Sequence, residues 1–198
     1  FIYELLQNAD DAQATSARFE LFNDKLVFAH NGTRRFSISN PKEEEEDREL
    51  GRLGDINAIT AVGASSKTKN DTIGKFGVGF KSVFQYTTTP HIYDPNVWFK
   101  IERFIVPIRL DVDYPGRNDD ETLFVFPFNH EERPPENACA DISEKLRSLV
   151  FPLLFLSNLK EVKFNFAYSC GGYGKEALET LDFRGTTAER IKLIQKQI

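Results

Sequence analysis

The N-terminal segment, residues 1–30, changes from helical to strand periodicity, and this change limits the folds that the chain can adopt. Apolar side chains first recur with helical spacing, on one broad face, at Ile2, Leu5, Leu6, Ala9 and Ala12. Residues 17–22 then alternate between apolar and polar, residues 23–24 are Asn-Asp and favour a turn, and residues 26–29 predict a returning strand. We therefore expect a helix followed directly by a β-hairpin.

Three polar residues lie in a narrow stripe on the opposite side of this predicted helix: Glu4, Asn8 and Asp11. Side chains four residues apart on a helix are neighbours, so the stripe places a carboxylate beside an amide. By itself such a stripe is typical of a solvated helix face. Two carboxylates and an amide in one line are also compatible with a built site, and a second motif is needed to separate the two interpretations.

The remaining pattern predicts further helices and strands. Strands are predicted at residues 91–93, 98–101, 123–128 and 162–168, and helices at 55–59, from about 78 to 84 and at 141–159. The charged run 40–49 is predicted as a solvated loop, and 171–174 as a turn. The hairpin-like connections are too short for βαβ crossovers. We therefore predict an α+β fold with a mixed, largely antiparallel sheet.

Length and composition are those of one ordinary globular domain, residues 1–198, with 40% hydrophobic and 28% charged residues. A net charge of −5 argues against a nucleic-acid-binding surface. The sequence has neither an apolar run long enough for a membrane span nor a secretory signal, which predicts a cytoplasmic or nuclear protein. Because the chain lacks methionine and begins inside the predicted helix, we expect a fragment of a longer protein.

A glycine-rich segment supplies the second motif. Gly74, Gly77 and Gly79 have the reverse of the dinucleotide-binding spacing, and Phe80 separates Gly79 from Lys81 where a P-loop needs the two adjacent. Glycines allow a ligand to approach the backbone closely, and free N–H groups at the start of the following helix favour phosphate. The alternative is a tight turn into a helix without a ligand.

The two motifs together resemble the GHKL ATPase superfamily, which includes gyrase B, the ninety-kilodalton heat-shock chaperone and the MutL proteins. Residues 4–12 resemble its N-box, and residues 73–80 are similar to its second glycine box. With His30-Asn31-Gly32 and residues 76–84 included, the sequence looks most like the sacsin-type branch. The resemblance covers roughly residues 1–130, and residues 131–198 are either the end of the same domain or the start of the next.

The resemblance implies a Bergerat-type ATP-binding fold, a two-layer sandwich with helices on one face of the sheet. It implies that Glu4 polarises the attacking water as general base and that Asn8 binds Mg²⁺, which bridges the ATP phosphates. Asp11 is implied to line the pocket or to be structural, and Thr122 to help fix the adenine through water. Further nucleotide contacts are implied, in the lid and the glycine segment, for Lys67, Gly74, Lys75, Phe76, Gly77, Val78, Gly79 and Phe80.

The sequence departs from the superfamily at the adenine-binding position. Most members have Asp-x-Gly, in which the aspartate accepts a hydrogen bond from the adenine amino group, whereas this chain has His30, Asn31 and Gly32. A neutral histidine accepts through one nitrogen, less strongly than a carboxylate. Either Asn31 or a displaced group takes the role, or nucleotide binding is weaker.

Two functions of different classes are compatible with these residues. The first is an ATPase module that closes a lid over Mg·ATP, around residues 63–71, and drives conformational change in a larger chaperone-like or defence-type protein with further domains and a possible homodimer. The second is a nucleotide-sensing or structural interaction domain with little turnover. Glu4 favours the first, and His30 favours the second. A histidine-kinase catalytic domain is a weaker alternative, because its N-box typically lacks the glutamate base.

Overall fold

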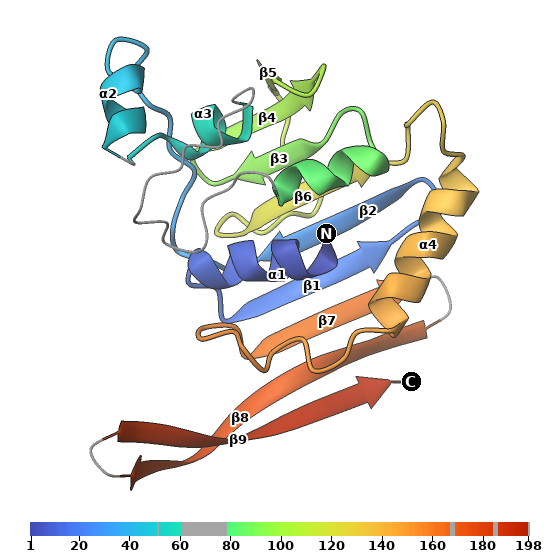
Figure 1. Cartoon of the computed structure of the whole chain (residues 1–198). Coiled ribbons are helices and arrows are strands. Elements are labelled where there is room, and N and C mark those ends of the chain that lie inside the picture. Colours follow the sequence, from blue (N-terminus) through green and yellow to red (C-terminus); the bar gives the residue numbers. More distant parts are fainter. Residues whose placement is uncertain (51, 61–78, 167–168, 184–185, 198) are drawn as a thin grey trace.

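The helix and hairpin predicted at the N-terminus are confirmed in the computed structural model, which describes residues 1–50, 52–60, 79–166, 169–183 and 186–197. Helix α1 spans Ile2–Asp11, and strands β1 and β2 span Ser16–Leu21 and Lys25–His30 (Figure 1). The two-residue turn is closed by a hydrogen bond from the Phe22 amide to the Lys25 carbonyl, 2.9 Å long. Local periodicity is therefore sufficient to predict this part of the fold.

Nine strands within the described residues form one sheet, in the order β5-β4-β3-β6-β2-β1-β7-β8-β9. The other strands are β3 His91–Asp94, β4 Val97–Glu102, β5 Val106–Arg109, β6 Thr122–Pro127, β7 Glu161–Phe166, β8 Ser169–Phe183 and β9 Thr186–Gln197. The pairing of β1 with β7 is parallel, and the other pairings are antiparallel. The predicted α+β class and its mixed, largely antiparallel sheet are confirmed.

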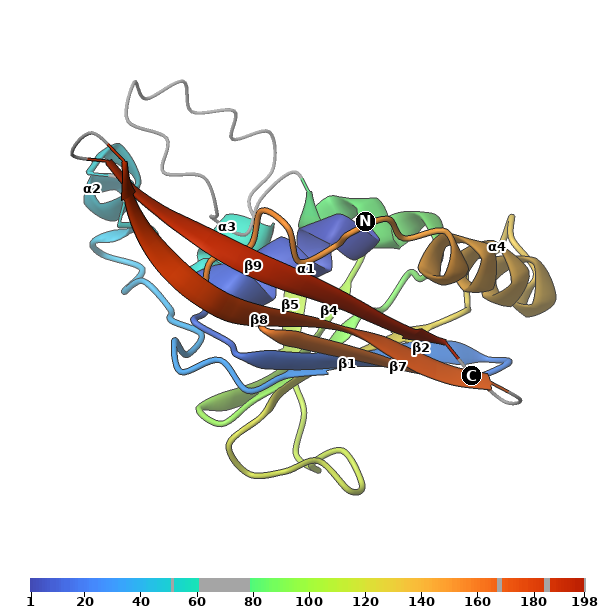
Figure 2. The same cartoon turned by 90° about the horizontal axis from the view of Figure 1, so that it is seen from below.

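The helices form a second layer on one face of this sheet (Figure 2). They are α1, α2 Glu44–Glu49, α3 Asp55–Thr60, the 3₁₀ helix η1 Phe80–Gln85 and α4 Pro135–Arg147. Aromatic rings fill the space between α1 and the central strands, where the Phe28 ring lies 4.6 Å from that of Phe19 and 5.8 Å from that of Phe124. This layer of rings fixes α1 over strands β1, β2 and β6.

Two predicted helices differ from the structure. The helix predicted at 141–159 is α4, which begins at Pro135 because Pro134 has an extended backbone (ψ 144°) and proline suits the first helical position. It ends at Arg147, and Phe151 has a positive φ of 45° before Pro152. The amphipathic helix predicted from Val78 is the short η1, which begins at Phe80.

Two predicted irregular segments are regular. Residues 44–49 of the charged run form α2, which buries none of its residues and has an ion pair between Arg48 and Glu44, so the predicted exposure is correct and the predicted loop is wrong. The turn predicted at 171–174 is wrong, because these residues pair with β7 inside β8. A Cβ on Gly171 would overlap the Phe164 ring, which explains a glycine there without a turn.

No helix in the described part of the chain has both the length and the apolar character needed to cross a membrane.

Candidate functional site

Helix α1 places Glu4 against the end of the glycine segment. The Glu4 side chain is exposed, and a Cβ on Gly79 would overlap its carboxylate and stand 3.1 Å from its Cγ. Only glycine allows the backbone at position 79 to approach Glu4 this closely. The two motifs, far apart in the sequence, therefore meet at this point of the structure.

Asn8 lies one turn further along the same helix and is buried, with 7% of its surface exposed. Its side chain makes no hydrogen bond within the described residues, and its Nδ2 is fully enclosed. A buried amide without a partner is rare, because the desolvation of each unpaired polar group costs about 1–3 kcal/mol. Its oxygen is a ligand of the type that Mg²⁺ accepts.

Asp11 is half-buried at the end of the stripe, and its Oδ2 is enclosed without a hydrogen-bond partner in the described residues. Burial raises the pKa of the Asp11 carboxyl, the neighbouring Asp10 charge raises it further, and Arg34 opposes both. Asp11 therefore lies close to the charge of Arg34, on the segment that follows the His30 turn.

Asp10 has a structural role that the sequence does not distinguish from that of Asp11. Its carboxylate accepts hydrogen bonds from the backbone amides of Ser157, Asn158 and Leu159, at 2.9, 2.7 and 2.7 Å. These bonds fasten the end of α1 to the loop before β7. The adjacent aspartates are thus separated, one bound to the scaffold and one without a partner.

His30 ends strand β2 and is buried, with 2% of its surface exposed and its ring beside those of Phe28 and Phe124. The Gly32 amide donates a hydrogen bond to His30 Nδ1 at 3.1 Å. Burial, with a smaller contribution from Arg35, lowers the pKa of His30 to about 3, so the ring is neutral at physiological pH. His30 Nε2 is enclosed and has no partner among the described residues.

Asn31 and Gly32 shape the turn after β2. Asn31 Oδ1 accepts hydrogen bonds from the amides of Thr15 and Ser16, at 2.9 and 3.0 Å, and its Nδ2 donates to Thr15 Oγ1. A Cβ on Gly32 would stand 2.8 Å from that of Ala12, so glycine lets the turn pack against the end of α1. The Asn31 side chain is therefore engaged with the scaffold and does not replace the missing aspartate.

Thr122 lies directly opposite His30, on strand β6, and is buried. Its hydroxyl donates a hydrogen bond of 2.8 Å to Asp94 Oδ2 at the end of β3, and Asp94 is also fully buried. Sequence reasoning missed Asp94, because the contact depends on the order of the strands. The only local signal was the Asp94-Pro95-Asn96 turn, in which the Asn96 amide donates to Asp94 Oδ1.

A cluster beside His30 was also missed. Arg34 pairs with Asp55 of α3, and Ser37 donates to the other Asp55 oxygen at 2.8 Å. A small cavity of about 10 Å³ is enclosed there by Ala12, His30, Arg34, Arg35, Phe36 and Asp55. No motif signals this cluster, since α3 reaches it only through the fold.

The glycine segment is described only at its end. Phe80, expected to contact nucleotide, is 1% exposed, and its ring packs against those of Phe124 and Phe126, so its side chain belongs to the core. Six expected contacts lie outside the described residues: Lys67, Gly74, Lys75, Phe76, Gly77 and Val78.

Three buried side-chain atoms without a hydrogen-bond partner occur in the described part of the chain: Asn8 Nδ2, Asp11 Oδ2 and His30 Nε2. All three belong to residues that the sequence singles out. The described residues contain no group of three or more His, Cys, Asp and Glu side chains that could hold a metal ion. A metal ion at Asn8 would therefore depend on oxygens of a ligand for much of its coordination.

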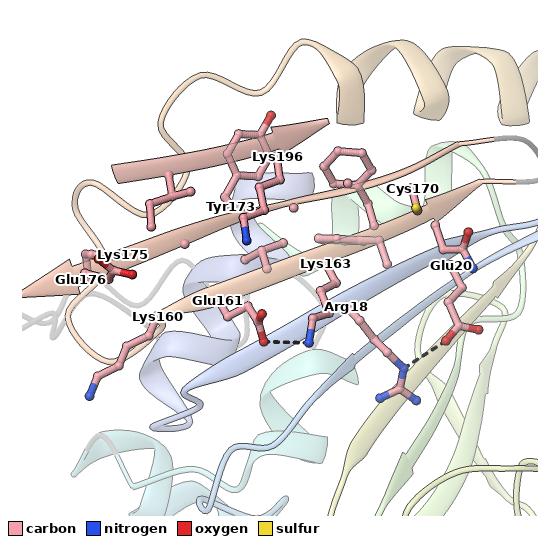
Figure 3. Close-up of a pocket in the computed structure, with 18 residues that line it drawn as sticks. Arg18, Glu20, Lys160, Glu161, Lys163, Cys170, Tyr173, Lys175, Glu176 and Lys196 are labelled. Atoms are coloured by element: carbon pink, nitrogen blue, oxygen red, sulfur yellow. Dashed lines mark hydrogen bonds and ion pairs between the residues drawn. The ribbon is translucent and has the colours of Figure 1, made fainter. Parts of the chain in front are cut away.

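A larger hollow, about 670 Å³, lies over strands β1, β7 and β8, away from these residues (Figure 3). Its lining is mixed, with the apolar Phe19, Val162 and Phe164 among charged residues, and it contains the ion pairs of Arg18 with Glu20 at 3.0 Å and of Lys163 with Glu161 at 2.9 Å. We place the candidate site along α1 and not in this hollow, because buried polar groups on α1 lack partners.

Comparison with known proteins places these residues in a family context. The family model of the sacsin domain matches residues 1–101, which include all the expected site residues except Thr122. Human sacsin (Homo sapiens) is 35% identical over 114 residues, or 48% of this chain and 2% of sacsin. Protein NO VEIN of Arabidopsis thaliana is 35% identical over 104 residues, or 52% of this chain and 3% of that protein. The chain thus spans only a few per cent of the length of these two relatives.

Among solved structures, the topoisomerase IV ATP-binding domain of Francisella tularensis, in complex with a small-molecule inhibitor, is similar with a TM-score of 0.40 and 16% sequence identity. The similarity covers 83% of this chain and 79% of that chain.

Proposed function

The chain belongs to the sacsin domain family, and from that premise we propose that it is an ATP-binding module that binds Mg·ATP along α1 and hydrolyses it. The observation that carries the proposal is the set of unpartnered buried atoms on Asn8, Asp11 and His30. Buried polar groups in folded proteins are almost always hydrogen-bonded, so a cluster of exceptions indicates a ligand that completes them. These residues are also the ones that the N-box and first glycine box use.

In this proposal the nucleotide lies along the stripe of α1, parallel to the helix axis. Glu4 and Gly79 lie at the phosphate end, and Asp11 and His30 lie at the base end. Residues 4 and 11 are separated by roughly 10 Å along the axis at 1.5 Å per residue. The purine and the terminal phosphate would therefore contact opposite ends of one helix.

Asn8 would hold the metal ion between these ends through its side-chain oxygen. Mg²⁺, when bound, neutralises the phosphate oxygens and orients the terminal phosphoryl group. The Asn8 side chain is buried, and its oxygen accepts no hydrogen bond from the described residues, so the oxygen is available to the metal ion. The enclosed Nδ2 is a donor and would need an acceptor from the nucleotide.

Glu4 would act on water at the phosphate end. Its carboxylate is exposed toward the segment that ends in Gly79, so it is able to accept a hydrogen bond from a water placed over the terminal phosphate and take its proton. Contacts of Lys67 and of residues 74–78, and closure of a lid around residues 63–71, are part of the proposal on sequence grounds alone.

The alternative is a nucleotide-sensing or structural domain with little turnover. The observation that favours it is the His30 turn, where Asn31 is engaged with the scaffold and a neutral histidine stands at the position of the usual aspartate. Turnover, and not the fold, separates the two functions.

Replacing Glu4 with glutamine tests the proposal. Removal of a general base typically lowers the rate by about 10²–10⁴-fold, so E4Q should lose ATP hydrolysis while its affinity for Mg·ATP changes little. The matched control is Glu136→Gln, an exposed carboxylate on α4 and not on α1, which should hydrolyse ATP at the wild-type rate. Equal hydrolysis by E4Q and wild type would contradict the role of Glu4. Binding without hydrolysis in the wild type would favour the sensing function.

A further inference from the structure

The buried His30 ring presents a hydrogen-bond donor, because its two nitrogens have different surroundings. Nδ1 accepts a hydrogen bond from the Gly32 amide at 3.1 Å, so it carries a lone pair and no proton. The ring is neutral, since full burial disfavours the charged form. The single proton is therefore on Nε2, which is the enclosed nitrogen without a partner.

Nε2–H has no hydrogen-bond acceptor among the described residues. The oxygens of Asp55 bond to Arg34 and Ser37, and that of Asn31 to backbone amides. The Thr122 hydroxyl, opposite His30 on the neighbouring strand, donates to Asp94. Such oxygens keep further lone pairs, so it is the unpartnered Nε2–H itself that calls for an acceptor on the ligand.

The same small cavity is lined by two cations, Arg34 and Arg35, and by the Asp55 carboxylate that pairs with Arg34. Arg35 lies close enough for its charge to disfavour a proton on His30, and it donates to the Gly32 carbonyl at 2.8 Å. The cavity's unpartnered atom is the Nε2–H donor, so an acceptor on the ligand completes this end of the site, and Phe36 adds an aromatic surface beside it.

Purine bases differ in the group that they carry at C6, which is the group that a base-reading residue contacts. Adenine carries an amino group at C6, which donates, whereas guanine and hypoxanthine carry an oxygen there, which accepts. A carboxylate at the base-reading position suits the amino group, and an N–H donor suits the oxygen. An adenine amino group that faced Nε2–H would leave two donors opposed and both without a partner.

We infer that His30 makes the base end of the proposed nucleotide site a donor site, which takes 6-oxopurine nucleoside triphosphates at least as readily as ATP. The inference rests on the proposed function, because it takes His30 to face the base. The cavity of about 10 Å³ is the size of one water molecule, so a base must displace a wall side chain.

The test compares ATP with inosine triphosphate, which differs in having an oxygen in place of the 6-amino group. Both nucleotides are titrated, with Mg²⁺, into the wild-type chain and into His30→Asp. The wild type should bind inosine triphosphate as tightly as ATP or more tightly. H30D restores an acceptor and should shift the ratio of the two dissociation constants by about tenfold or more toward ATP. Ring-nitrogen NMR of His30 should show a proton on Nε2 whose resonance moves when inosine triphosphate binds.

The outcomes separate the inference from the proposed function. Clear preference of the wild type for ATP, or binding of inosine triphosphate without a change at His30 Nε2, would overturn the inference and leave the nucleotide site intact. Absence of binding by both nucleotides would contradict the proposed function itself. If H30D fails to fold, as judged by its thermal transition, the wild-type titrations and the NMR readout still decide.

Discussion

At the scale of single residues, hydrogen bonds separate scaffold from site. Asp10 and Asp11 are adjacent in the sequence, yet Asp10 accepts three backbone amides and Asp11 has an enclosed oxygen without a partner. The partners of Asp10 lie at residues 157–159, so no local pattern could have distinguished the two. Sequence reasoning singled out the stripe that contains Asp11 and could not predict that its neighbour Asp10, outside the stripe, holds the fold.

Asp10→Ala should therefore destabilise the fold. It would leave the amides of Ser157, Asn158 and Leu159 without their acceptor, at a cost of about 3 kcal/mol in the free energy of unfolding, since hydrogen bonds to charged groups contribute about 1.5–3 kcal/mol and unpaired donors add to the loss. Urea unfolding measures this, with Asp11→Ala as the matched control, which should lose less than about 1 kcal/mol. Equal losses in the two variants would contradict the structural role of Asp10.

His30 should make the protein sensitive to acid. Its pKa is lowered from 6.5 to about 3 in the folded state, so between these values the unfolded chain binds a proton that the folded chain does not. This contribution to stability is present above pH 6.5 and is lost as the pH falls toward 3, by up to about 1.4 kcal/mol per pH unit. Chemical denaturation from pH 7.5 to 4.5 measures it, and His30→Gln should show a shallower decline. The same decline in both proteins would exclude His30 as its source.

At the scale of elements, the sequence was sufficient to predict segments with strong periodicity. It was not sufficient to predict strands that depend on long-range pairing. The α1 helix and the β1–β2 hairpin follow the sequence pattern closely. The β8–β9 pair was missed, because Gly171 and its neighbours resemble a turn until β7 provides the Phe164 ring against which glycine fits. Helix α4 was misplaced, because apolar residues after Arg147 continue the pattern although the backbone turns at Phe151.

The junction of α1 with η1 yields a prediction at this scale. A Cβ on Gly79 would overlap the Glu4 carboxylate, so Gly79→Ala should push Glu4 out of position and lower ATP hydrolysis by up to about 10²-fold, with a smaller effect on stability. The matched control is Gly174→Ala in β8, where the nearest atom to an added Cβ is 3.7 Å away. Steady-state hydrolysis by both variants provides the measurement. Wild-type activity in Gly79→Ala would show that the Glu4–Gly79 contact has no part in turnover.

At the scale of the whole molecule, the site and the C-terminal half share one framework. Strand β7 pairs with β1 in parallel, and the loop before it is held by Asp10 of α1. Residues 157–159, which lie beyond the family match, therefore brace the helix that carries the stripe. This arrangement supports the proposal that residues 1–198 are a single nucleotide-binding domain.

The central claim is that α1 binds Mg·ATP through Asn8, and calorimetric titration of ATP with Mg²⁺ and with EDTA tests it most directly. Wild-type protein should bind more tightly with Mg²⁺, and Asn8→Ala should lose that gain, by about tenfold or more, because one coordinated oxygen contributes about 1–2 kcal/mol. Asn137→Ala, an exposed asparagine on α4, should keep the gain in affinity that Mg²⁺ gives. The account would be contradicted if Asn8→Ala bound Mg·ATP as tightly as the wild type does. It would also be contradicted if the wild type bound ATP equally tightly with Mg²⁺ and with EDTA.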